Sequence, residues 1–243
     1  MNRIICGDVL TVLPKLERAK MIFADPPDNI GLKYDNGRSD NIDLSEYKIQ
    51  MMRWLQIALD SSDVVWWSIN RLHQNWFIFR LNELLLHWVG DADQIRQFIW
   101  YFTFGQHRDK DCGNNYRPIF RVAPKDYPWN TDAIRVPSAR QTKYNDKRAN
   151  AKGRVPGDVW EFSRVCGTFK ERRTWHPTQH PQALVERAIL MSTQPGDLVI
   201  DPFAGTGTTL RACEATGRRC ILIEVSEKYC EEISRETGLP VEK

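Results

Sequence analysis

The chain has 243 residues, of which 42% are hydrophobic and 27% are charged, and its formal net charge is +3. These values are close to the averages of globular domains, so they exclude disordered, collagen-like and coiled-coil proteins. No apolar run approaches the ~20 residues that cross a bilayer, so we expect no membrane segment. The opening residues MNRIICGDVL lack the pattern of a signal peptide, and the six cysteines include no CxxC pair. We therefore expect a cytoplasmic protein with reduced thiols that begins as written.

Short β-rich runs alternate with helical stretches along the chain, which is typical of a mainly parallel sheet with helices on its faces. The predicted strands are, in order, 3–6, 21–24, 64–69, 99–103, 119–122, 198–200 and 220–223. The predicted helices are 44–60, 71–88, a helix through Leu184, Ala188 and Met191, 208–216 and 226–236. Glycines follow the last two helices, where a left-handed residue commonly ends a helix. The pattern predicts one α/β sheet.

Charge is distributed unevenly along this chain. Residues 105–173 contain sixteen Lys and Arg against eight Asp and Glu, whereas the remainder has an acidic excess of five. Prolines, glycines and asparagines interrupt the basic residues, so they form no helical stripe. On a long loop, such side chains neutralise a phosphate backbone, and the alternative is a solvated loop without a partner. The basic residues that we single out for binding nucleic acid are Arg135, Arg140, Lys143, Lys147, Arg148 and Arg154.

A predicted strand leads into a glycine-rich turn and a helix in LVIDPFAGTGTTL, residues 198–210. Gly205 and Gly207 permit backbone angles and a close approach of a ligand that a side chain would prevent. Glu224 ends the next strand, nineteen residues after Gly205, where a carboxylate accepts hydrogen bonds from the ribose hydroxyls of a nucleoside. Asp201 before the turn would attract an ammonium group. The pattern favours S-adenosylmethionine over a nicotinamide dinucleotide, and tight packing without a ligand is the alternative.

A second motif, MIFADPPDN, ends the predicted strand at 21–24. Pro26 and Pro27 lack N–H donors and hold the backbone extended, so the carbonyl oxygen of Asp25 or Pro26 is expected to point outward. Together with the Asp25 carboxylate, it forms a group of acceptors that suits a planar exocyclic amino group. Accepting both amino hydrogens makes the nitrogen lone pair available for attack on an electrophilic methyl group. A simple turn at a strand end is the alternative.

With these two motifs, the sequence resembles the DNA amino-methyltransferases that act on adenine N6 or cytosine N4. Their signatures are an acidic or polar residue followed by Pro-Pro and an aromatic residue, and Phe-x-Gly-x-Gly, which stand here at 25–28 and 203–207. The catalytic motif comes first, as in the beta group. The resemblance implies a Rossmann-like class I methyltransferase fold with circularly permuted motifs. It also implies a catalytic half at 1–104, a target-recognition insertion at 105–173 and a cofactor-binding half at 174–243.

The resemblance also implies roles for individual residues. Asp8 would contact the adenine end of S-adenosylmethionine, and the segment WHPTQHP at 175–181 would contact its methionine end. The implied catalytic residues are Asp25, Pro26, Pro27 and Asp28. The implied cofactor-binding residues are Asp8, Asp25, His176, Thr178, Asp201, Phe203, Ala204, Gly205, Thr206, Gly207, Thr208 and Glu224. We expect no metal, since Pro177 and Pro181 make a helical pair of histidine ligands at 176 and 180 unfavourable.

Asp28 departs from the family pattern, which has an aromatic ring at this position. Such a ring stacks on the target base after the base has flipped out of the duplex. Tyr34, or one of Trp66 and Trp67, would have to supply a ring instead. We expect at least one of the two tryptophans in the core, because adjacent strand residues face opposite sides of a sheet.

The resemblance predicts a site-specific, S-adenosylmethionine-dependent DNA methyltransferase of the restriction-modification type that acts on double-stranded DNA. Adenine N6 is the preferred target, because an aspartate before Pro-Pro is more usual among the N6 enzymes. Cytosine N4 is the main alternative. A catalytically inactive DNA-binding relative, and an RNA or protein-amide methyltransferase, are further alternatives. A homodimer is also expected, since members of the beta group are often dimers.

Overall fold

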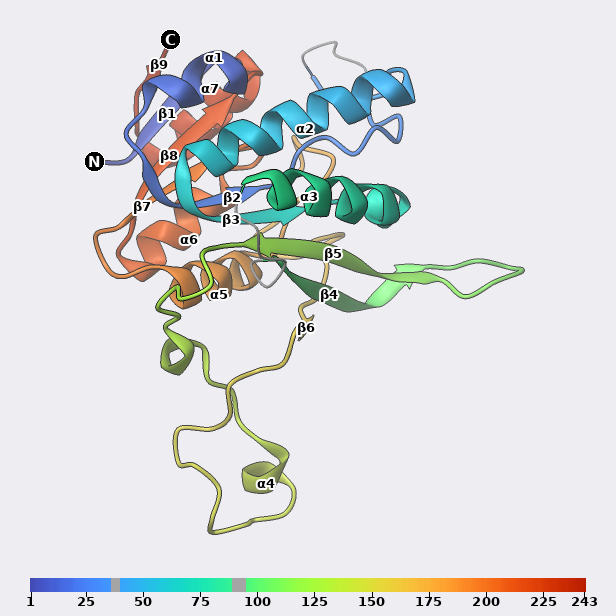
Figure 1. Cartoon of the computed structure of the whole chain (residues 1–243), viewed down its shortest axis with the longest axis vertical. Helices are drawn as coiled ribbons and strands as arrows, with labels where there is room; N and C mark the ends of the chain where they lie inside the picture. The colour runs from blue at the N-terminus through green and yellow to red at the C-terminus, as the bar shows by residue number, and fades with distance from the viewer. Residues whose placement is uncertain (36–39, 89–94) are drawn as a thin grey trace.

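The structure is a computed structural model that describes residues 1–35, 40–88 and 95–243. These residues form a nine-stranded sheet in the order β6-β4-β5-β3-β2-β7-β8-β1-β9, with helices on both faces (Figure 1). The strands are β1 (Arg3–Cys6), β2 (Ala19–Ala24), β3 (Ser62–Ser68), β4 (Ile95–Gln106), β5 (Asn114–Val122), β6 (Val159–Glu161), β7 (Leu198–Asp201), β8 (Arg219–Glu224) and β9 (Val241–Glu242). The helices are α1 (Val9–Val12), α2 (Leu44–Asp60), α3 (Gln74–Trp88), α4 (Ala139–Thr142), α5 (Gln182–Ser192), α6 (Thr208–Thr216) and α7 (Glu227–Thr237). Among the described helices, none has the length and apolar character needed to cross a bilayer.

The strands that carry the two motifs are direct neighbours. β2 and β7 pair in parallel, with Ile22 opposite Ile200. β3, β8 and β1 extend the parallel part of the sheet, whereas β5 runs antiparallel to β3 and β4. All the predicted strands are present, and the prediction of a mainly parallel sheet is confirmed; the short strands β6 and β9 have no counterpart in the prediction. Because the carboxyl ends of parallel strands lie at the same edge of a sheet, Asp25, Asp201 and Glu224 all lie at that edge.

Helix α2 has the bounds that its hydrophobic pattern predicts. Asp43 caps its first turn by accepting hydrogen bonds from the Ser45 and Glu46 N–H groups at 2.8 and 3.2 Å. The buried face consists of Tyr47, Met51, Trp54, Leu55 and Ala58. From this face, the Tyr47 hydroxyl donates to the Pro27 carbonyl oxygen at 3.2 Å. Helix α2 therefore supports the loop that follows β2.

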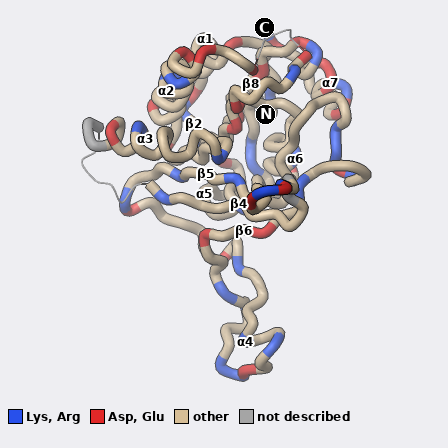
Figure 2. The backbone as a smooth tube through the Cα atoms, turned by 90° about the vertical axis from the view of Figure 1, so that its right-hand side faces the viewer, with Lys and Arg blue, Asp and Glu red and all other residues tan. Residues whose placement is uncertain are grey.

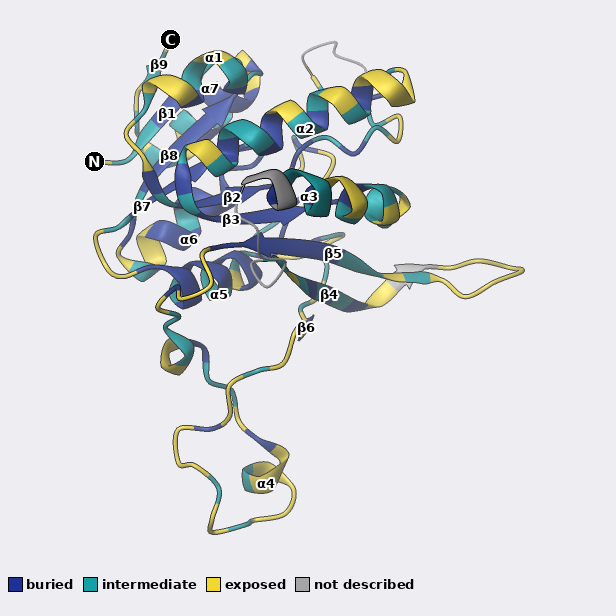
Figure 3. Ribbon diagram, in the orientation of Figure 1, coloured by how far each residue is buried: buried dark blue, intermediate teal, exposed yellow. Residues whose placement is uncertain are grey.

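Adjacent residues of β3 point into two different cores. Trp66 lies among aromatic side chains of β4 and β6 and donates its indole N–H to the Ser192 hydroxyl at 2.8 Å. Trp67 faces the other way and stacks against Phe77 of α3. Both tryptophans are 0% exposed, within the buried sheet that Figure 3 shows between its helices. The expectation that one of them supplies a ring to a bound base is therefore wrong, because helices cover both faces of the sheet.

The basic block at 105–173 does not form a separate unit. Its strand β5 pairs with β3 in the central sheet, and β6 pairs with β4 at the end of the same sheet. The turn between β4 and β5 extends sideways from the body, and residues 123–158, here called the arm, extend downward and carry α4 (Figure 1). The arm contains eight Lys and Arg against four Asp. The positive charge counted over residues 105–173 therefore includes both a strand of the central sheet and the basic arm.

The arm is fastened to the body at its base and closed at its neck. The Asn130 N–H donates to the Met191 carbonyl oxygen at 2.9 Å, and the Arg121 guanidinium of β5 lies 3.5 Å from the centre of the Trp129 ring. At the neck, Val136 and Arg154 exchange two backbone hydrogen bonds of 2.9 and 2.8 Å. Next to this pair, Gly153 has a φ of +86°, and a Cβ there would lie 2.3 Å from the Val136 carbonyl oxygen.

Replacing Trp66 by alanine is expected to lower the free energy of unfolding by about 3–5 kcal/mol, because it removes a fully buried ring and leaves a cavity. Urea denaturation followed by far-ultraviolet circular dichroism measures the change. Phe79→Ala is the matched control, since Phe79 is 61% exposed and its loss should cost less than about 0.5 kcal/mol. A loss below about 1 kcal/mol for Trp66→Ala would contradict its assignment to the core.

Candidate active site

A cavity of about 980 Å³ opens at the carboxyl ends of the parallel strands, between the two motifs. The predicted site residues that line it are Asp8, Asp25, Pro26, Pro27, Asp28, Tyr34, His176, Thr178, Asp201, Phe203, Ala204, Gly205, Thr206, Thr208 and Glu224. Gly207 stands apart from this lining. It has a φ of +71°, and a Cβ there would lie 3.2 Å from the Ile233 side chain. Gly207 is therefore needed for the turn and for close packing of α7.

The glycine turn after β7 is fixed by the carboxylate that ends β8. Glu224 accepts hydrogen bonds from the N–H groups of Gly205 and Ser226, both at 2.9 Å. Gly205 has a φ of +50°, and a Cβ there would lie 3.3 Å from Nε2 of His176. The turn, the end of β8 and the segment at 175–181 thus meet at one point, and only glycine fits without strain.

Asp201 is a buried carboxyl at the cavity wall. Burial raises its pKa to about 7, although the Thr209 hydroxyl and the Phe203 N–H donate hydrogen bonds to it at 2.5 and 3.0 Å. The nearby carboxylates of Asp25 and Glu224 raise it further. A cation placed beside Asp201 would stabilise its charged form.

His176 connects the cavity to Tyr34. Its ring lies 4.7 Å from the ring of Tyr229 and 5.7 Å from that of Tyr34, measured between centres. Nδ1 of His176 lies 2.6 Å from the Thr178 carbonyl oxygen. Burial lowers the pKa of His176, so the ring is neutral at pH 7. Tyr34 therefore lies on the side of the cavity that the glycine turn forms.

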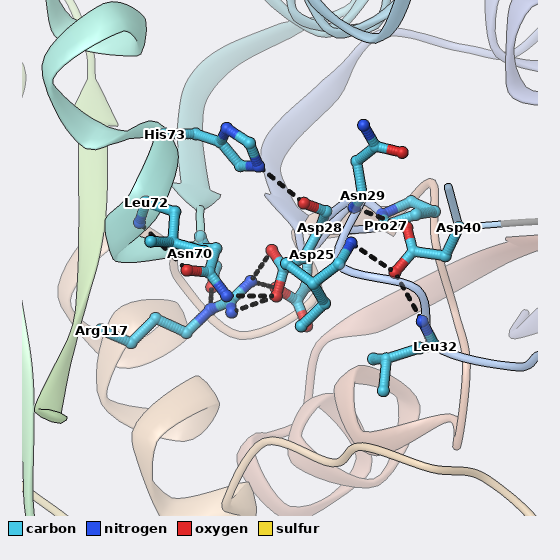
Figure 4. A network of polar contacts seen from close by, with 12 residues as sticks. Asp25, Pro27, Asp28, Asn29, Leu32, Asp40, Asn70, Leu72, His73 and Arg117 are labelled. Atoms are coloured by element: carbon cyan, nitrogen blue, oxygen red, sulfur yellow. Dashed lines mark hydrogen bonds and ion pairs between the residues drawn. The ribbon is translucent and has the colours of Figure 1, made fainter. Parts of the chain in front are cut away.

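The Asp-Pro-Pro-Asp segment is bound to an arginine from another strand (Figure 4). Arg117 of β5 donates from Nη2 to Asp25 at 2.6 Å and forms two bonds of 2.7 and 2.9 Å to the Asp28 carboxylate. Its Nε donates to the Ser68 hydroxyl at 2.6 Å. One guanidinium thus holds two carboxylates, and the sequence analysis did not assign this residue to the site.

His180 completes the surroundings of Asp25. Its Nδ1 lies 3.0 Å from the second carboxylate oxygen of Asp25, and its Nε2 lies 3.1 Å from the Ser68 hydroxyl. Burial would raise the pKa of Asp25, but Arg117 and His180 hold it well below its usual range. Asp25 is therefore ionised and acts only as an acceptor.

The loop after the motif is held by its own set of contacts, which Figure 4 also shows. His73 Nε2 lies 2.7 Å from the Asp28 carbonyl oxygen, and the Asn70 amide donates to the Asp28 carboxylate at 3.2 Å. Asp40, which is 4% exposed, accepts from the Asn29 N–H at 2.5 Å and from two further backbone N–H groups of the loop. Contacts with Asn70, His73 and Arg117 thus fix the position of Asp28.

Arg117, His180, Ser68 and Asn70 are site residues that sequence reasoning missed. His180 had a signal, because it lies in the WHPTQHP segment. Arg117 was one arginine among sixteen basic residues of the block, and nothing in the sequence pairs it with position 28. The contacts of Arg117 depend on β5 lying beside β3, which a single sequence does not reveal.

The six basic residues predicted to bind nucleic acid lie on the arm, whose basic positions Figure 2 shows, and none of them lines the cavity, whereas Tyr34 does. Three of them form ion pairs within the arm. Arg140 and Arg148 both bind Asp146, and Arg135 binds Asp132 and the Gly153 carbonyl oxygen. The other three, Lys143, Lys147 and Arg154, are exposed.

Residues 19–235 match the DNA methylase family N6_N4_Mtase. The chain belongs to this family. Type II methyltransferase M.HpaI of Haemophilus parainfluenzae is 32% identical over 240 residues, which cover 95% of this chain and 72% of that protein. DNA adenine methyltransferase YhdJ of Escherichia coli (strain K12) is 33% identical over 244 residues, which cover 93% and 79%. The prediction of a DNA methyltransferase is confirmed at this level.

Solved structures of DNA methyltransferases have the same fold as this methylase. The complex of M1.HpyAVI with S-adenosylmethionine has a TM-score of 0.67 at 18% identity and covers 98% of this chain and 100% of that one. The cytosine-N4-specific PvuII methyltransferase also has a TM-score of 0.67, at 15% identity, and covers 96% and 85%. The predicted class I methyltransferase fold is confirmed.

Asp201 should make the stability of this methylase fall as the pH rises. Its pKa is about 7 in the folded state, above the ~3.9 of an unfolded chain, so between these values the folded state holds one more proton. The free energy of unfolding then decreases by up to ~1.4 kcal/mol per pH unit in this window. Urea denaturation between pH 4.5 and 7.5 measures the slope, which Asp201→Asn should reduce. Asp109→Asn, at an exposed position, should keep it; equal slopes in all three proteins would contradict the assignment.

Proposed function

We propose that this methylase transfers the methyl group of S-adenosylmethionine to the N6 amino group of an adenine that has flipped out of double-stranded DNA. The observation that carries the proposal is the placement of an ionised Asp25 beside the glycine turn of β7, in one cavity. The preference for adenine is supported by the 33% identity to YhdJ, which is named as a DNA adenine methyltransferase.

The residues around the glycine turn fit S-adenosylmethionine, which supplies an electrophilic methyl group on a sulfonium. Gly205 offers a surface without a side chain, and Glu224 beside it is placed to accept from the ribose hydroxyls. Asp201 is a buried carboxyl whose raised pKa would fall on meeting the ammonium group of an amino acid. His176 and Tyr34 border the same part of the cavity.

The contribution of the protein to the transfer is to position and orient the amino group. The Asp25 carboxylate accepts one amino hydrogen, and we assign the other to the Pro26 carbonyl oxygen. This pair draws the nitrogen lone pair out of conjugation and directs it at the methyl carbon, an effect of orientation that contributes several kcal/mol. As the nitrogen–carbon bond forms and the carbon–sulfur bond breaks, one amino proton is released.

Asp25 and Glu224 should separate catalysis from cofactor binding. Asp25→Asn is expected to lower methyl transfer at least 10²-fold, because an uncharged amide replaces the anionic acceptor of the amino hydrogen, and to leave the Kd for S-adenosylmethionine within about threefold. Glu224→Ala should weaken that Kd by about 10- to 100-fold. Transfer of labelled methyl groups and calorimetric titration measure the two properties, with Asp109→Asn as the control. Equal losses of both properties in Asp25→Asn would mean that Asp25 is structural.

The exposed basic residues of the arm should provide salt-dependent affinity for DNA. Replacing Lys143, Lys147 and Arg154 together by alanine should reduce the slope of log K against log salt by about 2 to 3, since each lost phosphate contact contributes ~0.9. Fluorescence anisotropy with duplex DNA at several salt concentrations measures the slope. The matched control replaces three basic residues of the body, Lys15, Arg219 and Lys243. An equal change in both triple variants would contradict a specific role of the arm.

The experiment that tests the proposed function identifies the methylated product. The protein is incubated with labelled S-adenosylmethionine and unmethylated duplex DNA, and the DNA is digested to nucleosides. N6-methyldeoxyadenosine is the expected product, whereas N4-methyldeoxycytidine would overturn the choice of base. Transfer to RNA or to protein in parallel reactions, with none to DNA, would overturn the proposed substrate.

A further inference from the structure

The Asp28 side chain contacts Arg117, and this contact fixes the orientation of the guanidinium plane in the cavity. A guanidinium donates its hydrogen bonds in its own plane. In Arg117, Nε donates to Ser68, Nη1 to Asp28, and Nη2 to both Asp25 and Asp28. Acceptors therefore occupy the edge of the guanidinium on all three nitrogens. These bonds use four of the five N–H groups, so what Arg117 offers to another molecule is one Nη1 N–H and the flat face of the guanidinium.

This plane is held rigidly at the wall of the cavity. The side chains of Asp28 and Arg117 are 12% and 16% exposed, and both residues line the cavity beside Asp25. Asn70 and His73 fix Asp28 in turn. Burial alone would lower the pKa of Arg117, but the two carboxylates raise it, so the group stays charged. A buried ion pair of this kind contributes little net stability, which points to a role in the site itself.

We propose that Arg117, oriented by Asp28, stacks the face of its guanidinium on the flipped target base. The inference rests on the proposed function and assigns the surface that receives the base. A flipped base has lost its stacking neighbours, and a planar guanidinium or ring replaces them in proteins that bind unstacked bases. Arg117 lies 2.6 Å from the carboxylate that would hold the amino group, so one residue positions the base plane next to its acceptor. Asp28 is then a positioning residue.

The two carboxylates also explain how a cation is tolerated at this place. Positive charge develops on the amino nitrogen during methyl transfer, and an isolated guanidinium beside it would oppose the reaction. Here Asp25, Asp28 and Arg117 together carry one net negative charge. The guanidinium face therefore supplies a plane without supplying a net positive charge.

Other rings lie in or near the cavity, and Trp100, Phe102 and Tyr116 are among those that line it. Trp66 and Trp67 are 0% exposed. Trp100 donates its N–H to the Phe162 carbonyl oxygen at 2.8 Å and packs against His180. Tyr34 packs against His176 on the side of the glycine turn, and it is the rival that the experiment includes.

Four variants at positions 117 and 28 test the proposal, with methyl transfer to duplex DNA measured in single turnovers at saturating DNA. Arg117→Ala should lower the rate constant at least about 10- to 100-fold, since it removes the stacking contact and also one of the two groups that keep Asp25 ionised. Arg117→Lys should stay as low, because lysine keeps the charge but has no plane. The double variant Asp28→Tyr, Arg117→Ala should recover most of the rate by supplying a ring. Its matched control, Asp28→Leu, Arg117→Ala, removes the same charges without a ring and should not recover.

The Kd for S-adenosylmethionine and the melting temperature are measured for every variant. The two double variants should match each other in both properties, so that a difference in their rates does not come from folding or from cofactor binding. The proposal is overturned if Arg117→Ala or Arg117→Lys is as active as the unaltered protein, or if the tyrosine and leucine double variants have equal rates. It is also overturned if Tyr34→Ala loses the rate while Arg117→Ala keeps it. Absence of transfer by the unaltered protein would instead reject the proposed function, and the same assay shows this before any variant is compared.

Discussion

The parallel pairing of β2 with β7 is the constraint on which the site depends. It joins two segments that are about 175 residues apart in the chain and ends both at the same edge of the sheet. Asp25 and Asp201 thereby become neighbouring carboxyl groups with opposite tendencies. Arg117 and His180 keep Asp25 ionised, whereas burial and the charge of Asp25 favour the protonated form of Asp201. The sheet thus creates two different chemical environments within one cavity.

The second constraint is that β5 runs antiparallel beside β3. This direction places Arg117 near the end of β3 at which Ser68 and Asn70 lie, so that one side chain bridges β3 and the loop after β2. The segment 175–181 adds His180 from a fourth part of the chain. Removing any one of these side chains would leave a buried charge or hydroxyl without its hydrogen-bond partner. The conformation of the motif is therefore coupled to the register of the sheet.

Local patterns in the sequence were sufficient for the elements and for both motifs. The bounds of α2 and α6, the seven longer strands and the glycine turn follow from periodicity, capping residues and glycine positions, which act over a few residues. Helices on the faces of the sheet were predicted, but the complete burial of both Trp66 and Trp67 depends on how closely those helices pack over β3, which is a long-range property. The place of β5 in the central sheet was missed for a similar reason, since charge composition does not distinguish a strand from a loop. The pairing of Asp28 with Arg117 is also a long-range contact. The sequence marked position 28 only as a departure from the family pattern.

The neck of the arm determines how well the chain tolerates insertions in the loop beyond it. The two hydrogen bonds between Val136 and Arg154 close a loop of residues 137–153 on itself, while Asn130 and Trp129 hold the base against α5 and β5. The entropy lost on closing a flexible loop grows only slowly with its length, by about 0.6 kcal/mol for each doubling. Insertions beyond the neck therefore cost little stability and leave the strands that line the cavity in place. The geometry allows the tip of the arm to diverge in length and sequence while the catalytic edge of the sheet is kept.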